Sequence, residues 1–174
     1  RAPPVSSSSP QTTGESVESR MDTEREMNKA PRVKLMVEFM MEMYRVQGGA
    51  TGKEMEETMA RIADLGKEGL AEAWLFLAMC YHFGVGGVTR DDKKAFEMYK
   101  KAADGGHANG MVSAGLCYYE GEGVEQSFEK AFELFKKAAD AGHAKGMVIA
   151  GVCYAKGEGV EQSFEKAFEL YLKA

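Results

Sequence analysis

Cysteine and histidine are the side chains in this sequence best suited to nucleophilic or metal chemistry, and both recur at regular intervals. Cys80, Cys117 and Cys153 are 37 and 36 residues apart, and His107 and His143 are 36 residues apart. A zinc site needs several such side chains at one point, often within Cys-x2-Cys or His-x3-His segments. No such segment occurs here, so this spacing favours equivalent positions in repeated structural units.

The three cysteines are expected to be packed, reduced thiols. Equivalent residues on stacked helices lie on the order of 10 Å apart, whereas a disulfide needs Cα atoms within about 7 Å. Reduced thiols are typical of a reducing compartment, so we expect a cytoplasmic protein. For the two histidines we expect a hydrogen bond at a helix end, and a metal site is the alternative.

Acidic side chains gather in two glycine-containing turns, and they do not predict a calcium site. Their spacing does not match the D-x-[DN]-x-[DN]-G loop, so a solvated acidic edge is the favoured interpretation. The Gly-x-Gly pairs lack the strand-to-helix context and the Lys-Ser/Thr of a phosphate loop. No nucleophile and base can be paired. We therefore expect no enzyme activity, catalytic residue, metal, cofactor or small-molecule substrate. The acidic residues are Glu120, Glu122, Glu125, Glu158 and Glu161.

An internal repeat organises the chain. The segment GEGVEQSFEKAFEL occurs at 121–134 and again at 157–170, and residues 108–138 differ from 144–174 at only seven of 31 positions. A more diverged copy begins at Ala71. A period of 20 to 50 residues indicates stacked supersecondary units, in which each unit contacts only its neighbours.

Each copy is predicted to form two helices. The first helices are expected at 71–83, 108–120 and 144–156, and the glycines within them predict close helix packing. The second helices are expected to start after Asp91, Ser127 and Ser163, which are good N-cap residues. Gly106 and Gly142 have the positions of glycines that end a helix.

The copies define the domain organisation. Residues 1–30 are rich in serine and proline and are expected to be a disordered tail or linker. Residues 31–70 are expected to form a degenerate hairpin that caps the stack, with Ala63–Gly66 matching Ala103–Gly106. Repeats follow at 71–107, 108–143 and 144–174, and we expect the last to be truncated. Methionines in the first hairpin favour core and capping contacts, with partner docking as the alternative; they are Met36, Met40, Met41 and Met43.

Charge and hydropathy exclude two classes of partner. The net charge is −5 and lysine and arginine form no basic block, so nucleic-acid binding is not expected. No run of 18 apolar residues occurs, so direct membrane insertion is not expected either.

The frame A-x-A-x3-L-A-x2-Y-x2-G-x-G…D-x3-A-x3-Y-x-K-A-A-x-x-G, from Ala71 to Gly106, resembles the Sel-1-like repeat, a relative of the tetratricopeptide repeat. The resemblance implies an all-α fold: a right-handed α/α superhelical solenoid with a concave binding face. It also implies adaptor or scaffold roles, some in quality control at the endoplasmic reticulum, which is the alternative location. Ala114 and Ala150 depart from the family pattern, which has leucine there, as at Leu77.

The residues expected to bind a partner form a stripe on the first helix of each repeat, where the copies diverge while their frame is kept. The stripe runs from aromatic and neutral in the first copy to cationic in the third; unselected drift is the alternative. Its members are Leu75, Met79, His82 and Phe83 in the first copy, Asn109, Val112, Leu116, Tyr119 and Glu120 in the second, and Lys145, Val148, Val152 and Lys156 in the third.

We conclude from the sequence that the chain is a protein–protein interaction scaffold or adaptor. A peptide or protein segment is expected to bind the concave face through apolar contacts, with charge setting its register. The alternative is a regulatory or substrate-recruiting module of a larger enzyme, such as a kinase or a ubiquitin-ligase complex of endoplasmic-reticulum quality control, with the catalytic part elsewhere.

Overall fold

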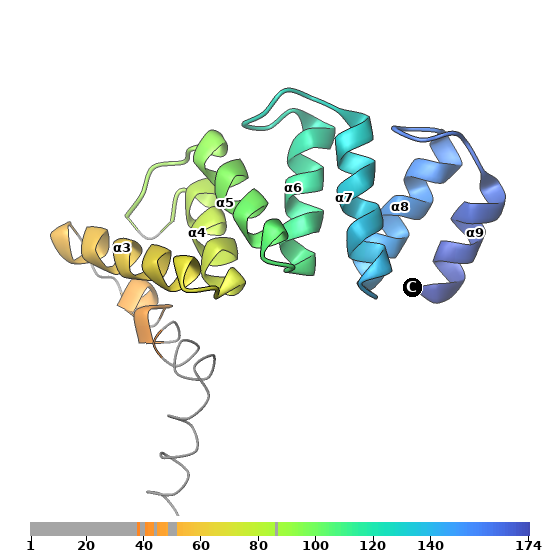
Figure 1. The fold of residues 1–174 in the computed structure, drawn as a ribbon. Helices are drawn as coiled ribbons and strands as arrows, with labels where there is room; N and C mark the ends of the chain where they lie inside the picture. Colours follow the sequence, from red (N-terminus) through yellow and green to blue (C-terminus); the bar gives the residue numbers. More distant parts are fainter. Residues whose placement is uncertain (1–37, 39–40, 44, 49–51, 86) are drawn as a thin grey trace, which may run out of the picture. The chain divides into compact units, whose positions relative to one another are not determined.

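The computed structural model describes residues 38, 41–43, 45–48, 52–85 and 87–174, and across them every regular element is helical. The predicted tail, Met36 and Met40 lie outside these residues. Three helical hairpins follow α3 in order (Figure 1). The helices are α3 (Lys53–Lys67), α4 (Ala71–Phe83), α5 (Asp92–Asp104), α6 (Ala108–Glu120), α7 (Phe128–Asp140), α8 (Ala144–Lys156) and α9 (Phe164–Lys173).

The helix ends are set by the residues that the sequence pattern predicted. Each second helix, α5, α7 or α9, begins after an N-cap whose side chain accepts a hydrogen bond from the backbone N–H three residues on. The first helices occupy the predicted ranges and end at left-handed glycines. Gly106 and Gly142, which were predicted to end helices, follow α5 and α7 and are left-handed as well. These predictions are confirmed. The caps are Asp91, Ser127 and Ser163, and the glycines are Gly84, Gly121 and Gly157.

The first helix of one repeat packs closely on the second helix of the repeat before it. A Cβ on Gly110 of α6 would lie 2.7 Å from the Cβ of Ala102 in α5, and Gly146 of α8 meets Ala138 of α7 in the same way. Only glycine permits this approach of two backbones. The close packing predicted from the helical glycines is therefore confirmed, and it fixes the spacing of the stack.

A tyrosine on α6 and its equivalent on α8 extend the same contact. The Tyr118 ring meets Phe96 of the preceding repeat edge-to-face at 5.0 Å, and Tyr154 meets Phe132 at the same distance. A lysine of the tyrosine's own second helix lies over each ring, with Nζ 5.4 Å from the ring centroid. We call the junction between one repeat's first helix and the preceding second helix the seam.

The structure corrects the predicted match between α3 and the later second helices. The N–H of Leu70 bonds to the carbonyl of Leu65, as the N–H of His107 bonds to the carbonyl of Ala102. Leu65 is thus equivalent to Ala102. The match predicted from Ala63–Gly66 would have aligned Leu65 three residues further along the chain. In the corrected register Met59 takes the place of Phe96, and Gly66 that of Ala103.

Gly66 is required by a single large side chain opposite it. A Cβ at Gly66 would overlap the indole ring of Trp74, whose position in the later repeats is held by Met111 and Met147. On α5 and α7, which face Met111 and Met147, an alanine takes the position that Gly66 has on α3. The pair Gly66–Trp74 therefore replaces an alanine–methionine pair at the first seam.

We expect the effect of Gly66→Ala on stability to depend on residue 74. With Trp74 present, the added methyl group overpacks the seam and costs about 1–3 kcal/mol. In a Trp74→Met background the clash is removed, and the better helix propensity of alanine stabilises by about 1 kcal/mol. Urea unfolding of the four proteins measures this coupling. Equal effects of Gly66→Ala in both backgrounds would show that the indole ring is not the constraint.

Candidate functional site

The first-helix stripe defined from the sequence presents two exposed apolar side chains in α4. Met79 and Phe83 have 44% and 63% of their surface exposed, whereas Leu75 and His82 are half-buried. The His82 ring packs edge-to-face against Phe83 at 4.6 Å and is 6.2 Å from Tyr99. This contact restrains the Phe83 ring although most of that ring faces solvent.

In α6 the same stripe is largely occupied by the following repeat. The Asn109 carboxamide oxygen lies 2.8 Å from Nε2 of His143, and the Tyr119 hydroxyl donates a hydrogen bond of 2.8 Å to Glu158. Leu116 packs against the core cluster that α7 forms with α8, and Glu120 is exposed. Val112 is only 1% exposed, so its expected contact with a partner is wrong: α6 buries it inside the stack.

The stripe is open again in α8. Val148, the equivalent of Val112, is 43% exposed, Lys145 is exposed and Val152 is half-buried. Lys156 is exposed, but its Nζ lies 3.6 Å from a Glu158 oxygen, and this carboxylate raises the pKa of the lysine. The hydrogen bond to Glu158 likewise raises the pKa of the Tyr119 hydroxyl.

The two repeated histidines take N-cap positions, but only one of them caps with its side chain. Nδ1 of His143 accepts a hydrogen bond of 3.2 Å from the backbone N–H of Gly146, which confirms the predicted contact at a helix end. Nδ1 of His107 is buried and has no hydrogen-bond partner, so the prediction is wrong for that ring. Within the described ranges, histidine, cysteine and carboxylate side chains form no group able to hold a metal ion.

The three cysteines are free and buried at equivalent positions. Burial raises the pKa of Cys80 and of Cys117 to about 11, and it raises the pKa of Cys153 as well. These thiols are therefore protonated at neutral pH and are poor nucleophiles. Their role is packing, as the sequence predicted.

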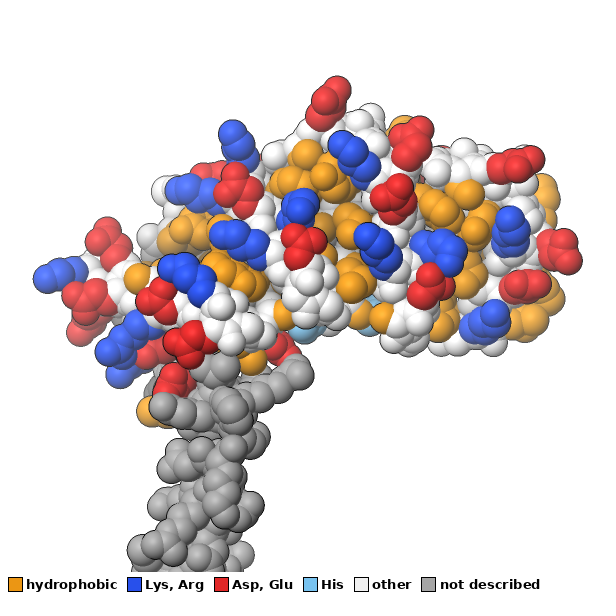
Figure 2. Space-filling view, viewed as in Figure 1, with side chains coloured by type: hydrophobic (Ala, Val, Ile, Leu, Met, Phe, Trp, Pro, Cys, Tyr) orange, Lys and Arg blue, Asp and Glu red, His pale blue; other side chains and the backbone are white. Residues whose placement is uncertain are grey.

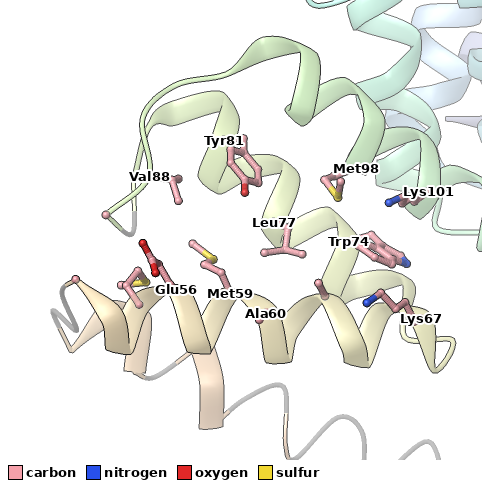
Figure 3. Close-up of a pocket in the computed structure, with 14 residues that line it drawn as sticks. Glu56, Met59, Ala60, Lys67, Trp74, Leu77, Tyr81, Val88, Met98 and Lys101 are labelled. Carbon is pink, nitrogen blue, oxygen red and sulfur yellow. The ribbon is translucent and has the colours of Figure 1, made fainter.

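A groove that the sequence did not predict lies at the first seam, between α3, α4 and α5 (Figure 3). Its volume is about 490 Å³. Apolar side chains line most of it, and Lys67 and Lys101 flank Trp74 at one end, away from Glu56. The apolar lining includes Met55, Met59, Trp74, Leu77, Tyr81 and Met98.

Two alanines on α3 are the signal that locates this groove. In the corrected register, Ala60 and Ala63 stand where α5 has Glu97 and Lys100, and where α7 also carries a glutamate and a lysine. The predicted register was displaced by three residues, which hid the substitution. Figure 2 shows apolar side chains exposed between the charged ones along this side of the molecule.

Helical hairpins that stack with one repeated seam define an α-solenoid. The model of the Sel1 repeat matches residues 71–107, 108–143 and 144–174. The chain belongs to the Sel1 repeat family. Repeats of this family generally mediate protein–protein interaction. In the part of the chain that the structure describes, no helix has the length and apolar character needed to cross a membrane.

Solved structures with this fold come from several bacteria. A Sel1 repeat protein from Oxalobacter formigenes superposes with a TM-score of 0.69 at 22% identity, covering 80% of this chain and 57% of that one. The protective antigen c5321 of uropathogenic Escherichia coli, which displays the same repeat fold, gives 0.68 at 28% identity, covering 88% and 32%. Helicobacter pylori cysteine rich protein B gives 0.55 at 21% identity, covering 72% and 90%.

This chain thus spans little more than half of the first of these proteins and about a third of the second. No curated protein matches it. The two structures under 25% identical establish the fold alone.

The buried thiols give a prediction about reactivity and pH. At neutral pH we expect native Cys80, Cys117 and Cys153 to react with a thiol reagent only on the timescale of unfolding, and all three to react at once in denaturant. Because the fold raises the pKa of two thiols from 9.0 to about 11, it favours their protonated form. That contribution to stability is complete below pH 9 and is lost as the pH rises through 11.

Labelling followed by mass spectrometry measures the reactivity, and urea unfolding at several pH values measures the stability. Rapid labelling of one native cysteine at neutral pH would contradict its burial.

Proposed function

We propose that the chain is a non-catalytic adaptor that binds a peptide or protein segment through the first-helix stripe. The observation that carries the proposal is the exposure of Met79 and Phe83 at the end of α4, followed by exposed Val85. A folded chain gains no stability from leaving such side chains in water, whereas aromatic residues and methionine are enriched at interfaces.

The structure supports restricting the binding surface to part of the predicted stripe. Phe83 is held by His82, so its binding conformation needs little further ordering. Val112 is buried, and Tyr119 and Asn109 are already bonded to the last repeat. We therefore assign the contact energy to Met79 and Phe83, and a minor steering role to Lys145.

The partner, in this proposal, is another protein. A module that recruits a substrate to a larger enzyme would use the same surface. The adaptor role and the recruiting role therefore differ in the protein that is bound and not in the surface that binds it. Three free, buried cysteines support a reducing compartment, and we propose the cytoplasm.

A double substitution, Met79→Ala with Phe83→Ala, tests the surface. Peptides are selected from a random display library on the immobilised wild-type chain, and their affinities are measured by fluorescence anisotropy. We expect a class of selected peptides to bind the double variant at least about tenfold more weakly, because central aromatic side chains dominate interface energies.

The matched control is Phe164→Ala with Leu172→Ala, which removes two exposed apolar side chains from α9. Circular dichroism must show both variants folded. If every selected peptide binds the Met79 and Phe83 variant at wild-type affinity, the stripe is not the binding surface.

A further inference from the structure

The groove at the first seam lies where the later seams are closed by an aromatic ring. Tyr118 and Tyr154 each meet a phenylalanine of the preceding second helix at 5.0 Å. Tyr81 is their equivalent and has the same lysine contact, with Lys94 Nζ 5.3 Å from its centroid. On α3 the place of the phenylalanine is held by Met59, and among the described residues Tyr81 meets no aromatic ring.

The outer edge of this seam is also open. At the second and third seams a lysine and an aspartate one turn apart form an ion pair, Lys100 with Asp104 at 3.1 Å and Lys136 with Asp140 at 2.8 Å. In α3 the lysine position is Ala63, and Ala60 replaces a glutamate. Two methyl groups thus border a space that longer charged side chains flank elsewhere in the stack.

The lining of the groove indicates what it accepts. Its volume of about 490 Å³ falls in the range of ligand sites. Met55, Met59 and Met98 give it an adaptable apolar wall, suited to a bulky side chain supplied by a partner. A phenyl or isobutyl group beneath Tyr81 would restore the contact that a phenylalanine makes at the other seams.

The lysines at one end of the groove set a second requirement for its occupant. Lys101 lies over the Trp74 ring with Nζ 4.4 Å from the ring centroid, and it forms no ion pair with another described residue. Lys67 lines the same end of the groove and already pairs with Asp64 at 2.8 Å. Glu56 lies at the opposite end (Figure 3). A carboxylate placed beside Trp74 therefore gains an ion pair with Lys101.

We propose that this groove is a second docking site, and that its occupant is an acidic protein segment. The segment inserts a phenylalanine or leucine beside Tyr81 and Met59 and directs an aspartate or glutamate to Lys101. None of the lining residues belongs to the first-helix stripe. The two sites are thus tested separately.

Trp74 provides the readout, because it is the only tryptophan in the chain and its ring lines the groove. The probe is a short synthetic peptide in which phenylalanine and leucine alternate with aspartate. We expect it to shift the Trp74 fluorescence of the whole chain on titration. A peptide with serine in place of the apolar residues, and one with lysine in place of aspartate, should bind at least about tenfold more weakly.

The decisive variant restores the residue types of the later seams, Ala60→Glu with Ala63→Lys. Ala60 is exposed and Ala63 is half-buried, and the later second helices carry glutamate and lysine at these positions, so the fold should be retained. We expect at least about a tenfold loss of affinity for the acidic probe. Ala60→Ser with Ala63→Ser is the matched control, which keeps the groove open and should bind like the wild type. Lys101→Gln should weaken binding of the acidic probe and reduce the salt dependence of that binding.

Three outcomes would overturn the proposal. In the first, the acidic probe fails to bind at all; in the second, it binds the Ala60→Glu, Ala63→Lys variant as well as the wild type; in the third, it binds no better than its lysine counterpart. Met79→Ala with Phe83→Ala serves as the cross-control. If that variant loses the probe while the groove variant keeps it, the probe occupies the first-helix stripe, and the groove is not its site.

Discussion

The structure depends on one repeated contact, the seam between a first helix and the second helix before it. Backbone approach at Gly110 sets the spacing, and the Tyr118 ring, held between Phe96 and its own repeat's lysine, sets the orientation. Because each repeat touches only its neighbours, the same small set of side chains has to work at every junction. The repeats share no common core that could adjust to a substitution at one seam. Such a substitution therefore alters the surface at that junction.

The first seam shows such a change. Trp74 takes the place of a methionine, Gly66 yields the space for the indole ring, and Met59 replaces the phenylalanine that would meet Tyr81. Together with the alanines on α3, these substitutions convert a closed junction into a groove. The positions whose shared residues stabilise the later seams are thus the same positions whose substitutions create a binding surface at the first seam.

Local signals in the sequence predicted the helices well, because caps and turn glycines act over a few residues. Asp91 and Ser127 start helices whose first turn they bond directly, and no distant contact is needed to infer that. The burial of Val112 and the register of α3 depend on the neighbouring repeat, which the sequence pattern did not place. A match by residue identity at Ala63–Gly66 was misleading. Hydrogen bonding at Leu70, visible only in the structure, gives the true register.

Amide hydrogen exchange, followed with and without a bound peptide, tests most directly whether departures from the shared frame form the binding surfaces. With a peptide selected on the whole chain, the account predicts slower exchange in α4, or in α3 and α5 beside the groove. The identical segments of α7 and α9, which hold only frame residues, should exchange unchanged apart from end effects. Protection confined to α7 and α9 would contradict the account, since it would place binding on the repeated frame itself.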